Sequence, residues 1–242
     1  MLTLTTRPRG LNEPLHTELG AMGFQPHNED VLEITPVEWP TQSLFRMAAL
    51  VVTSANGAFE LGKVPHAPRE MPVFAVGIAT AACLKRFGFI NVYHADGTAV
   101  DLLRLVMRKM PPGSGPILHV GGLHLSLDMA AALRSQGYEA IRVIVYEATA
   151  RARLSAGTEQ HLRRHKVGAV VLMSKRTAEI FGVLVRKSDL VPSLARIEAF
   201  VMSPAIAAVL DAAKWRRIHI AAAPSRAALT DLLGCEAARI AL

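Results

Sequence analysis

Short apolar runs alternate along this chain with longer stretches of helical character. Leu2–Thr6, Met47–Thr53 and Ala169–Met173 are runs of this kind. The stretches that follow them are about 9–12 residues long, which suits helices that cover a sheet. Strands separated by helices pair in parallel most readily, because the helix carries the chain back to the edge where the strand began. The pattern therefore predicts an α/β fold of mostly parallel sheets flanked by helices.

The chain also repeats itself, which predicts two similar lobes. A strand, a turn, a helix and a glycine open each half, at Leu4–Phe24 and again at Leu118–Tyr138. A second kind of unit follows each time, with Val51–Ala58 matching Val171–Ala178. Repetition alone leaves two arrangements open: the lobes are contiguous halves, or the outer pair of units encloses the inner pair.

Composition and termini exclude several classes of protein. No segment approaches the ~18 consecutive apolar residues of a membrane-spanning helix. Met1–Gly10 contains two arginines but no apolar stretch after them, so we expect no secretory signal there. Cys83 and Cys235 are the only cysteines and form neither a disulfide framework nor a metal-binding motif. We therefore expect a cytoplasmic protein without a membrane partner, and, because no amphipathic interface stands out, a monomer.

The net charge of +7 attracts anions, which include nucleic acids, acidic lipids and small polyacids. A basic stretch between residues 151 and 166 is placed to meet nucleic-acid phosphates. It lacks the interleaved aromatic residues on which bases stack. A solvated basic face is the better interpretation, and we expect no nucleic-acid partner.

Small and hydroxylic residues follow the predicted strands. Ligands of open α/β sheets bind beyond the carboxyl ends of the strands, where helix N-termini present unpaired N–H groups. Each of these turns is explained on its own as a helix cap. Their recurrence in two lobes favours a shared ligand with many carboxylates. The turns are Thr6-Arg7-Pro8, Thr53-Ser54-Ala55, Gly77-Ile78-Ala79-Thr80, Gly121-Gly122, Ser174-Lys175-Arg176 and Ser203-Pro204.

Histidines offer weaker candidates. His161 and His165 are spaced like helical metal ligands, but no third ligand is near and the neighbouring cations would repel a metal, so we expect no metal site. His119 and His124 flank the Gly121-Gly122 pair and are placed to touch a ligand, unless one of them is a buried strand histidine. No dinucleotide-binding, P-loop or nucleophile-elbow motif occurs in the sequence.

Four short motifs, in order and over nearly the whole length, resemble those of the uroporphyrinogen-III synthase family. They are Thr6-Arg7-Pro8 after the first strand, Val52–Asn56 and Val76–Ala81 ahead of helices, and Val145-Tyr146 at the end of a strand. The resemblance implies two α/β lobes joined by a two-stranded linker, with the inner segment nested in the outer ones. On that basis we expect an outer discontinuous domain of residues 1–36 plus 149–242 and an inner domain of residues 37–148.

The resemblance also implies an activity. The enzyme would be a lyase that cyclises hydroxymethylbilane, a linear tetrapyrrole with eight carboxylates, to uroporphyrinogen III with inversion of ring D and loss of water. It would need no cofactor. Its main task would be to hold a flexible substrate folded, which is a positioning effect and agrees with the absence of a catalytic dyad in the sequence.

The family's site residues carry over by position. Tyr146 would assist departure of the hydroxyl group by donating a hydrogen bond, although a tyrosine merely packed at a strand end is an equal alternative. Carboxylate-binding roles would fall to Thr53, Ser54, Gly77, Thr80 and Ser174, with charge from Arg7 and Lys175 and backbone amides from Gly121 and Gly122.

The second lobe departs from the family pattern. Ser203–Ala207 stands where the family commonly has a glycine followed by hydroxylic residues, and Met173 stands where a threonine often precedes the serine. These departures keep a second hypothesis open, a non-catalytic relative that binds a tetrapyrrole or another polyanion.

Overall fold

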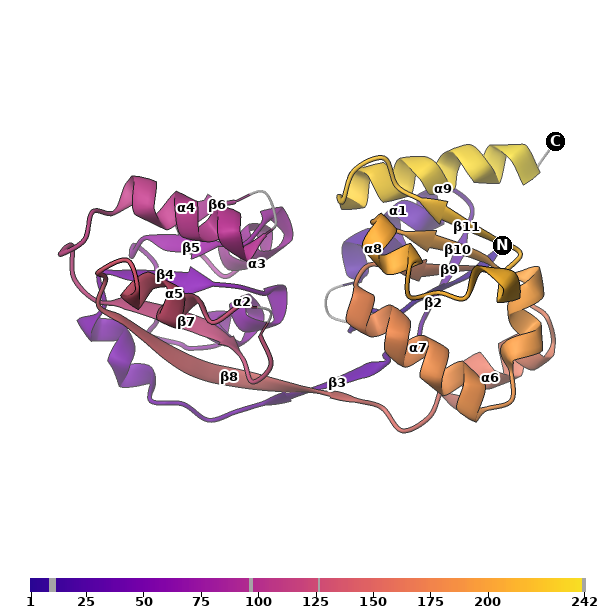
Figure 1. Cartoon of the computed structure of the whole chain (residues 1–242), viewed down its shortest axis with the longest axis horizontal. Helices are drawn as coiled ribbons and strands as arrows, with labels where there is room; N and C mark the ends of the chain where they lie inside the picture. The colour runs from indigo at the N-terminus through magenta and orange to yellow at the C-terminus, as the bar shows by residue number, and fades with distance from the viewer. Residues whose placement is uncertain (9–11, 96–97, 126, 241–242) are drawn as a thin grey trace. The chain divides into compact units, whose positions relative to one another are not determined.

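A computed structural model of the chain describes residues 1–8, 12–95, 98–125 and 127–240. Its contacts divide the chain into two compact units (Figure 1). Unit 1 comprises Met1–Glu33 with Thr149–Leu242, and unit 2 comprises Ile34–Ala148. The predicted α/β fold with mostly parallel sheets is confirmed. The predicted domain bounds, 1–36 plus 149–242 and 37–148, stay a prediction.

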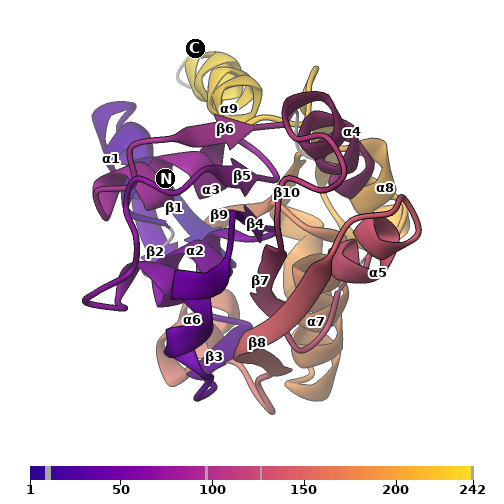
Figure 2. The same ribbon diagram turned by 90° about the vertical axis from the view of Figure 1, so that its left-hand side faces the viewer.

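Unit 2 is built on a six-stranded sheet with the order β3-β8-β7-β4-β5-β6 (Figure 2). Its pairings from β8 through β6 are all parallel. The strands are β3 (Leu32–Pro36), β4 (Ala49–Val52), β5 (Val73–Ala75), β6 (Val92–His94), β7 (Ile117–Gly122) and β8 (Ala140–Ala150). The helices are η2 (Thr41–Arg46), α2 (Ala55–Gly62), α3 (Ile78–Arg86), α4 (Ala99–Lys109) and α5 (Met129–Arg134).

Unit 1 has a five-stranded sheet with the order β11-β10-β9-β1-β2, in which every pairing is parallel. The strands are β1 (Leu2–Thr5), β2 (Gln25–Asn28), β9 (Val167–Leu172), β10 (Glu198–Val201) and β11 (Arg217–Ile220). The helices are α1 (Glu13–Ala21), α6 (Ala156–Arg163), α7 (Lys175–Lys187), η3 (Val191–Arg196), α8 (Pro204–Ala207), η4 (Ala212–Lys214) and α9 (Arg226–Ile240).

Strand pairing decides between the two arrangements that the repeats left open. In unit 1, the first strand of the chain pairs with a late strand, with Thr5 opposite Val171. In unit 2, the matching pair is β7 and β4, with His119 opposite Val51. Val51 and Val171 are equivalent residues of the repeat, so the outer copies share one sheet and the inner copies share the other. The chain passes between the units through β3 and β8, which pair antiparallel, as shown by the hydrogen bonds from Val37 to Val145 and from Arg151 to Val31.

Apolar side chains cover both faces of the central strands, as buried parallel sheets require. In unit 1, one core gathers Leu4, Val170 and Phe181. A second core gathers Val171 and Phe200 with residues of α1 and α9. Adjacent residues of one strand thus point into opposite cores, which is the alternation that a strand imposes.

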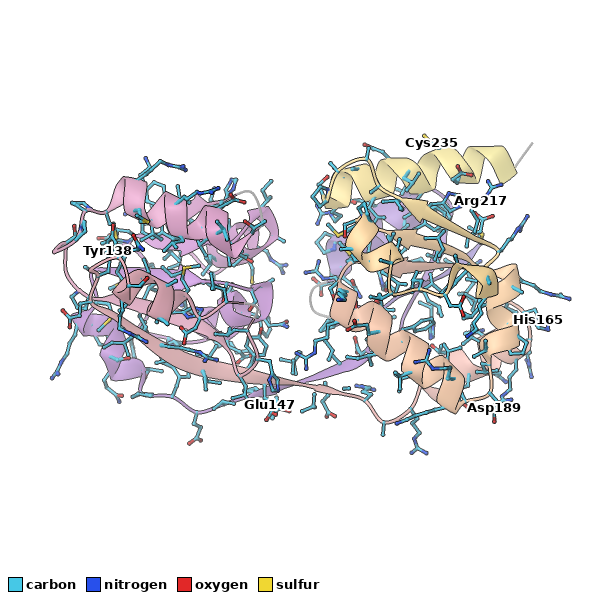
Figure 3. The ribbon with its side chains drawn as sticks, in the orientation of Figure 1. Tyr138, Glu147, His165, Asp189, Arg217 and Cys235 are labelled. Atoms are coloured by element: carbon cyan, nitrogen blue, oxygen red, sulfur yellow. The ribbon has the colours of Figure 1, made fainter. Side chains whose placement is uncertain are left out.

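Several elements differ from the sequence-based expectation. The polar strand β2 was not predicted, because Gln25–Asn28 has no apolar alternation and lies at the sheet edge, where one partner suffices. α8 ends after a single turn at Ala207, and α5 begins only at Met129, so both are shorter than the 9–12 residues expected of the helices between strands. His165 and Asp189, which Figure 3 labels, follow the ends of α6 and α7. Both have a positive φ although neither is glycine.

One buried carboxylate joins the two chain segments of unit 1. Glu29, 1% exposed, follows β2 and accepts hydrogen bonds from the backbone N–H and the hydroxyl of Ser155. Ser155 in turn caps α6 by accepting from the Thr158 N–H at 3.2 Å. The interaction spans 126 positions of the chain and orients the first turn of α6.

We expect Glu29→Gln to lower the free energy of unfolding by about 1–3 kcal/mol, because a glutamine amide cannot accept from both Ser155 donors without leaving its own N–H buried. Urea unfolding followed by circular dichroism measures the change. Glu33→Gln, at an exposed position in the following strand, is the control and should shift stability by less than about 0.5 kcal/mol. Equal effects of the two substitutions would contradict this role of Glu29.

Candidate functional site

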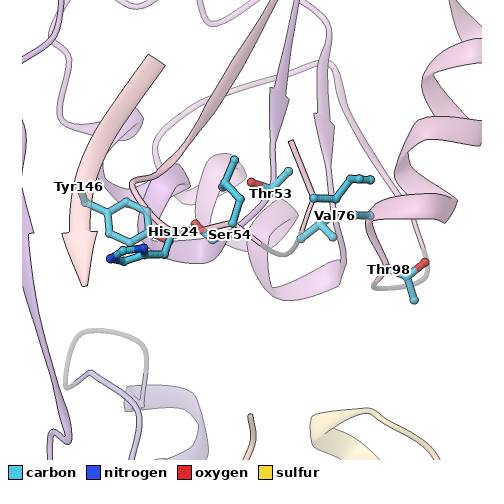
Figure 4. A pocket seen from close by; sticks show the side chains of 9 residues that line it. Thr53, Ser54, Val76, Thr98, His124 and Tyr146 are labelled. Carbon is cyan, nitrogen blue, oxygen red and sulfur yellow. Dashed lines mark hydrogen bonds between the residues drawn. The ribbon is translucent and has the colours of Figure 1, made fainter. Parts of the chain in front are cut away.

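A pocket lies at the carboxyl edge of the unit 2 sheet. The chain proceeds from β4 to β5 and β6 on one side, and β7 and β8 lie on the other side, so the order reverses between β4 and β7. Such reversal points open a crevice in which ligands of α/β sheets bind. The cavity has a volume of about 460 Å³. Figure 4 shows the side chains that line it. It is lined by Thr53, Ser54, Val76, Thr98, Ala99, His124, Leu125, Leu127 and Tyr146.

Two hydroxyl groups meet in this pocket. The Tyr146 hydroxyl donates to Ser54 Oγ at 3.0 Å, and the Gly57 N–H donates to the same oxygen at 3.0 Å. The second bond makes Ser54 the N-cap of α2, as the sequence indicated. Because Ser54 Oγ accepts two hydrogen bonds here, its own proton is free to be donated into the pocket. The pair therefore forms a hydrogen-bond donor at a helix N-terminus, where partial positive charge favours electron-rich ligand atoms.

A glycine in β7 makes room for the Tyr146 ring. A Cβ atom on Gly122 would lie 2.6 Å from Cζ of Tyr146, closer than real Cβ contacts allow. Gly122 is paired with Tyr146 across β7 and β8, after a register irregularity. Arg142 fixes the chain that follows by donating to the carbonyl oxygens of Gly122 and Leu123, both at 2.8 Å. Gly121 and Gly122 thus belong to the strand itself rather than to a turn after it.

A buried histidine supports the other pocket hydroxyl. Nε2 of His119 lies 3.1 Å from Thr53 Oγ1, and Nδ1 lies 3.8 Å from a carboxylate oxygen of Asp128. His119 is fully buried. Burial lowers the pKa of His119 to about 4, although the Asp128 carboxylate acts in the opposite direction. The imidazole is therefore neutral near pH 7.

Asp128 stays ionised beside this imidazole. Burial alone would raise the pKa of Asp128, but the backbone N–H of Ala131 and the Arg142 guanidinium outweigh it, so the pKa lies below its usual value. The carboxylate caps α5 by accepting from Ala131 at 3.1 Å. It thus presents a fixed negative charge to one nitrogen of His119.

The remaining predicted residues of unit 2 lie near the pocket but do not line it. Gly77 is the N-cap residue of α3, and Thr80 is buried in the first turn of that helix. The sequence did not single out Thr98 or the supporting pair Asp128 and Arg142. A signal existed for Thr98, because the Thr-x-x-Asp pattern that it forms with Asp101 resembles a capping box.

The equivalent edge of unit 1 lies between β1 and β9. The Thr6 hydroxyl donates to the Val171 carbonyl at 3.3 Å and so links the two strands. Ser174 caps α7 by accepting from Thr177 N at 3.1 Å. Lys175 is exposed and lies 3.8 Å from Glu179 on the same helix. The structure therefore places both serines of the repeat, Ser54 and Ser174, at the start of the helix after the central strand.

Arg7 at this edge has no acidic partner among the residues that the structure describes. Its side chain is partly buried, and burial, followed by the charge of Arg226, lowers the pKa of Arg7 from its ordinary value. A partly buried cation beside another cation is stabilised by an anion. Arg7 is thus a candidate contact for a negatively charged ligand.

The histidine pair at the end of α6 lacks the geometry of helical metal ligands. α6 ends at Arg163, so His165 lies beyond the helix, and the His161 ring packs edge-on against His27 at 5.1 Å between centroids.

Another cluster within the described residues combines Glu198, His219 and Glu236. Its carboxylates face opposite ring nitrogens of His219, at 3.0 and 3.8 Å. A metal ion coordinates one ring nitrogen, so carboxylates on opposite sides of the imidazole do not suit a metal site.

We expect the stability of the protein to depend on pH through His119. The folded-state pKa of about 4 lies below the ordinary value of 6.5. The contribution of neutral His119 to the free energy of unfolding is therefore complete above pH 6.5. Up to about 3 kcal/mol of it is lost as the pH falls toward 4, because the unfolded chain binds the proton more readily than the folded one. Urea unfolding of wild type and His119→Gln from pH 7 to 4 measures this difference. Parallel pH profiles of the two proteins would contradict it.

The part of the chain that the structure describes contains no helix that is both long and apolar enough to cross a membrane.

The comparisons with known proteins agree with this architecture. A uroporphyrinogen-III synthetase from Helicobacter pylori has a TM-score of 0.63 at 16% sequence identity, covering 96% of this chain and 98% of that chain. A mutant uroporphyrinogen III synthase from the extremely thermophilic bacterium Thermus thermophilus has a TM-score of 0.56 at 20% identity, covering 99% of both chains. At these identities the likeness establishes the fold. A search of curated proteins gave no match.

The structural likeness shows the fold alone, whereas a match to a family model shows the family. The model described as uroporphyrinogen-III synthase HemD matches residues 13–231. The match runs from α1 to α9 and includes both units and the pocket residues. The chain therefore belongs to the uroporphyrinogen-III synthase family, whose enzymes act in tetrapyrrole biosynthesis.

Proposed function

We propose that this chain is a lyase that closes hydroxymethylbilane to uroporphyrinogen III, with inversion of ring D and loss of water. The observation that carries the proposal is the Tyr146–Ser54 hydroxyl pair, which lines a pocket at the reversal point of the unit 2 sheet. Family membership supports the substrate class, and the pocket offers hydrogen-bond donors suited to a leaving hydroxyl group.

Tyr146 and Ser54 assist departure of the substrate hydroxyl group. As the carbon–oxygen bond breaks, its electron pair leaves with the oxygen, which takes up a proton to become water. The linear tetrapyrrole then carries an azafulvene cation. The substituted carbon of ring D attacks this cation to form a spiro intermediate, which fragments and recloses. Aromatisation after closure releases one proton, so the overall reaction loses one water molecule.

Positioning is the larger part of catalysis in this proposal. Without an enzyme, the open chain closes to the symmetric isomer I, so the site must hold ring D in the less accessible orientation. Exposed apolar residues stand after three successive strands of unit 2 and are suited to contact pyrrole faces. They are Ile78, Val100 and Leu123. Fixing a flexible substrate in a reactive conformation lowers the activation free energy substantially without charged acid–base groups.

Carboxylate recognition falls to the helix N-termini and to cations. Ser174 and the first backbone amides of α2 and α7 support this proposal as anion-binding groups, while the Ser54 hydroxyl serves the leaving group. Arg7 adds a positive charge that lacks a carboxylate partner among the described residues, and Lys175 adds an exposed one. Gly77, Thr80, Gly121 and Gly122 contribute in this proposal through backbone groups or by shaping the pocket. The net charge of +7 attracts the octa-anionic substrate.

The proposal also covers the setting of the enzyme. We propose a cytoplasmic monomer of two domains, 1–36 plus 149–242 and 37–148, that acts on a small molecule without a metal or organic cofactor. The reaction breaks and forms bonds without net electron transfer, so it makes no demand for a redox group. The supporting features are the sequence repeat and the absence of a metal-binding or dinucleotide motif in the sequence.

A second candidate function is binding of a tetrapyrrole or another polyanion without turnover. The observation that favours it is the turn after β10, where α8 is a single turn and Ser203 makes no side-chain capping bond. Ala205 and Ile206 supply no hydroxyl groups there. Turnover separates this candidate from the lyase.

The test is a coupled assay in which hydroxymethylbilane is generated in place by its synthase. The products are oxidised and separated into isomers I and III by chromatography. The proposal predicts mostly isomer III. Only isomer I, formed at the uncatalysed rate in the presence of folded protein, would overturn it and favour the binding candidate.

We expect Tyr146→Phe to lower kcat for isomer III by roughly 10²-fold, because Ser54 loses the hydrogen bond through which Tyr146 passes a proton toward the leaving hydroxyl. Tyr93→Phe is the matched control, since Tyr93 lies on β6, stacks on Phe74 and does not line the pocket. The control should keep wild-type kcat. Equal activity of the two variants would remove Tyr146 from the mechanism.

Arg7→Gln should raise KM by roughly tenfold or more with a smaller change in kcat, because a charge-assisted hydrogen bond to a carboxylate is lost. Steady-state kinetics at fixed ionic strength measure the effect. Arg217→Gln removes an exposed arginine on β11 and serves as the control for net charge. A similar rise in KM for both variants would show a general effect of charge instead of a contact made by Arg7.

A further inference from the structure

The buried residue His119 has no role in the mechanism above, although it contacts a pocket hydroxyl group. Its imidazole lies between Asp128 and Thr53 and is closed off from solvent. The structure leaves narrow room around the pair, because a Cβ atom on Gly121 would lie 3.1 Å from His119 Nε2 and 3.3 Å from Thr53 Oγ1. Gly121 thus places backbone atoms without a side chain next to this hydrogen bond.

The charges around His119 select one tautomer. A neutral imidazole carries one proton, on either Nδ1 or Nε2. Nδ1 faces the ionised Asp128 at 3.8 Å and has no hydrogen-bond partner among the described residues. A proton on Nδ1 is attracted by that carboxylate, whereas a bare Nδ1 lone pair would be repelled by it. The proton therefore sits on Nδ1, and Nε2 is an acceptor.

The tautomer determines what Thr53 offers to a ligand. With Nε2 as an acceptor, the Thr53 hydroxyl donates its only proton to the hydrogen bond with His119. Its oxygen then faces the pocket with lone pairs alone. Ser54 is the opposite case, because its oxygen accepts from Tyr146 and Gly57 and its proton remains free. Adjacent residues thus present an acceptor and a donor to the same cavity.

We propose that His119 is a positioning residue that makes Thr53 a hydrogen-bond acceptor for a pyrrole N–H of the substrate, rather than a donor to a carboxylate. The proposal rests on the proposed function. It revises the carboxylate-binding role that the sequence motif suggested for Thr53, because an oxygen without a free proton repels a carboxylate.

A hydrogen-bond acceptor at Thr53 stabilises the transition state in this proposal. When the carbon–oxygen bond breaks, the electron pair leaves with the hydroxyl group, which takes a solvent proton through the Tyr146–Ser54 pair. The pyrrole nitrogen lone pair shifts toward the carbon, and positive charge develops on that nitrogen. Its N–H becomes a stronger donor, so a fixed oxygen lone pair binds it more tightly in the transition state than in the ground state. Donation from Thr53 to His119 polarises the oxygen further.

The first test needs no substrate. The full chain is labelled with ¹⁵N-histidine, and long-range ¹H–¹⁵N correlation at pH 7 shows which nitrogen of His119 carries the proton, with His119→Gln providing the assignment. The proposal expects Nδ1–H, with a loss of this preference in Asp128→Asn. Observation of Nε2–H would overturn it, and this result is independent of whether the protein turns over hydroxymethylbilane.

The second test uses the isomer III assay with wild type, Thr53→Val, Thr53→Ser, His119→Leu and the double variant Thr53→Val/His119→Leu. We expect Thr53→Val and His119→Leu each to lower kcat about tenfold with KM changed less than about twofold, and Thr53→Ser to restore most of it. The double variant should be no worse than Thr53→Val alone, because His119 acts through Thr53. A purely structural role for His119 would give multiplying losses.

Controls keep the kinetic result interpretable. His119→Gln places an amide oxygen near the position of Nε2 and should recover activity to within about threefold of wild type, which also covers the case in which His119→Leu fails to fold. His66→Leu, at an exposed position, should leave kcat unchanged. A rise in KM with unchanged kcat in Thr53→Val would overturn the proposal in favour of carboxylate binding. Absence of isomer III with wild type would instead overturn the proposed function.

Discussion

The parallel pairing of strands that are far apart in sequence is the constraint on which the rest of the structure depends. β4 pairs with β7 in unit 2, and β9 pairs with β1 in unit 1, so each sheet reverses its strand order beside a central strand. The reversal separates the connections at the carboxyl edge and leaves polar turns there instead of covering helices. It also explains why the same sequence signal, a serine that caps the following helix, recurs at Ser54 and Ser174.

The pocket of unit 2 combines hydroxyl groups of opposite hydrogen-bonding character. Ser54 is held as a donor by the backbone of α2 and by Tyr146. Thr53 is paired with the neutral imidazole of His119. Fixed hydrogen-bonding groups in a partly enclosed cavity need little reorganisation when charge develops on a ligand, which is the physical basis of electrostatic catalysis. This chemistry suits a reaction that creates a transient cation and expels water.

Much of the fold could be predicted from the sequence, because the alternation of apolar runs and helices survives in nearly every element. The nested topology could not be read from the repeat alone, since strand pairing between distant segments leaves no local signal. The glycines of β7 were recognised for the wrong physical reason. Gly122 admits the ring of Tyr146 and does not follow the strand as a turn. The roles of Asp128 and Arg142 were not predicted, because they depend on a contact between the start of α5 and β8.

The central claim is that the carboxyl edge of the unit 2 sheet holds the linear tetrapyrrole. The most direct measurement is amide ¹H–¹⁵N shift mapping with an unreactive linear tetrapyrrole that carries a methyl group in place of the hydroxymethyl group. The account predicts that the shifts gather at residues 53–57, at 121–124 and at 146. Shifts confined to the basic stretch from Arg151 to Lys166, with the pocket residues unchanged, would contradict it.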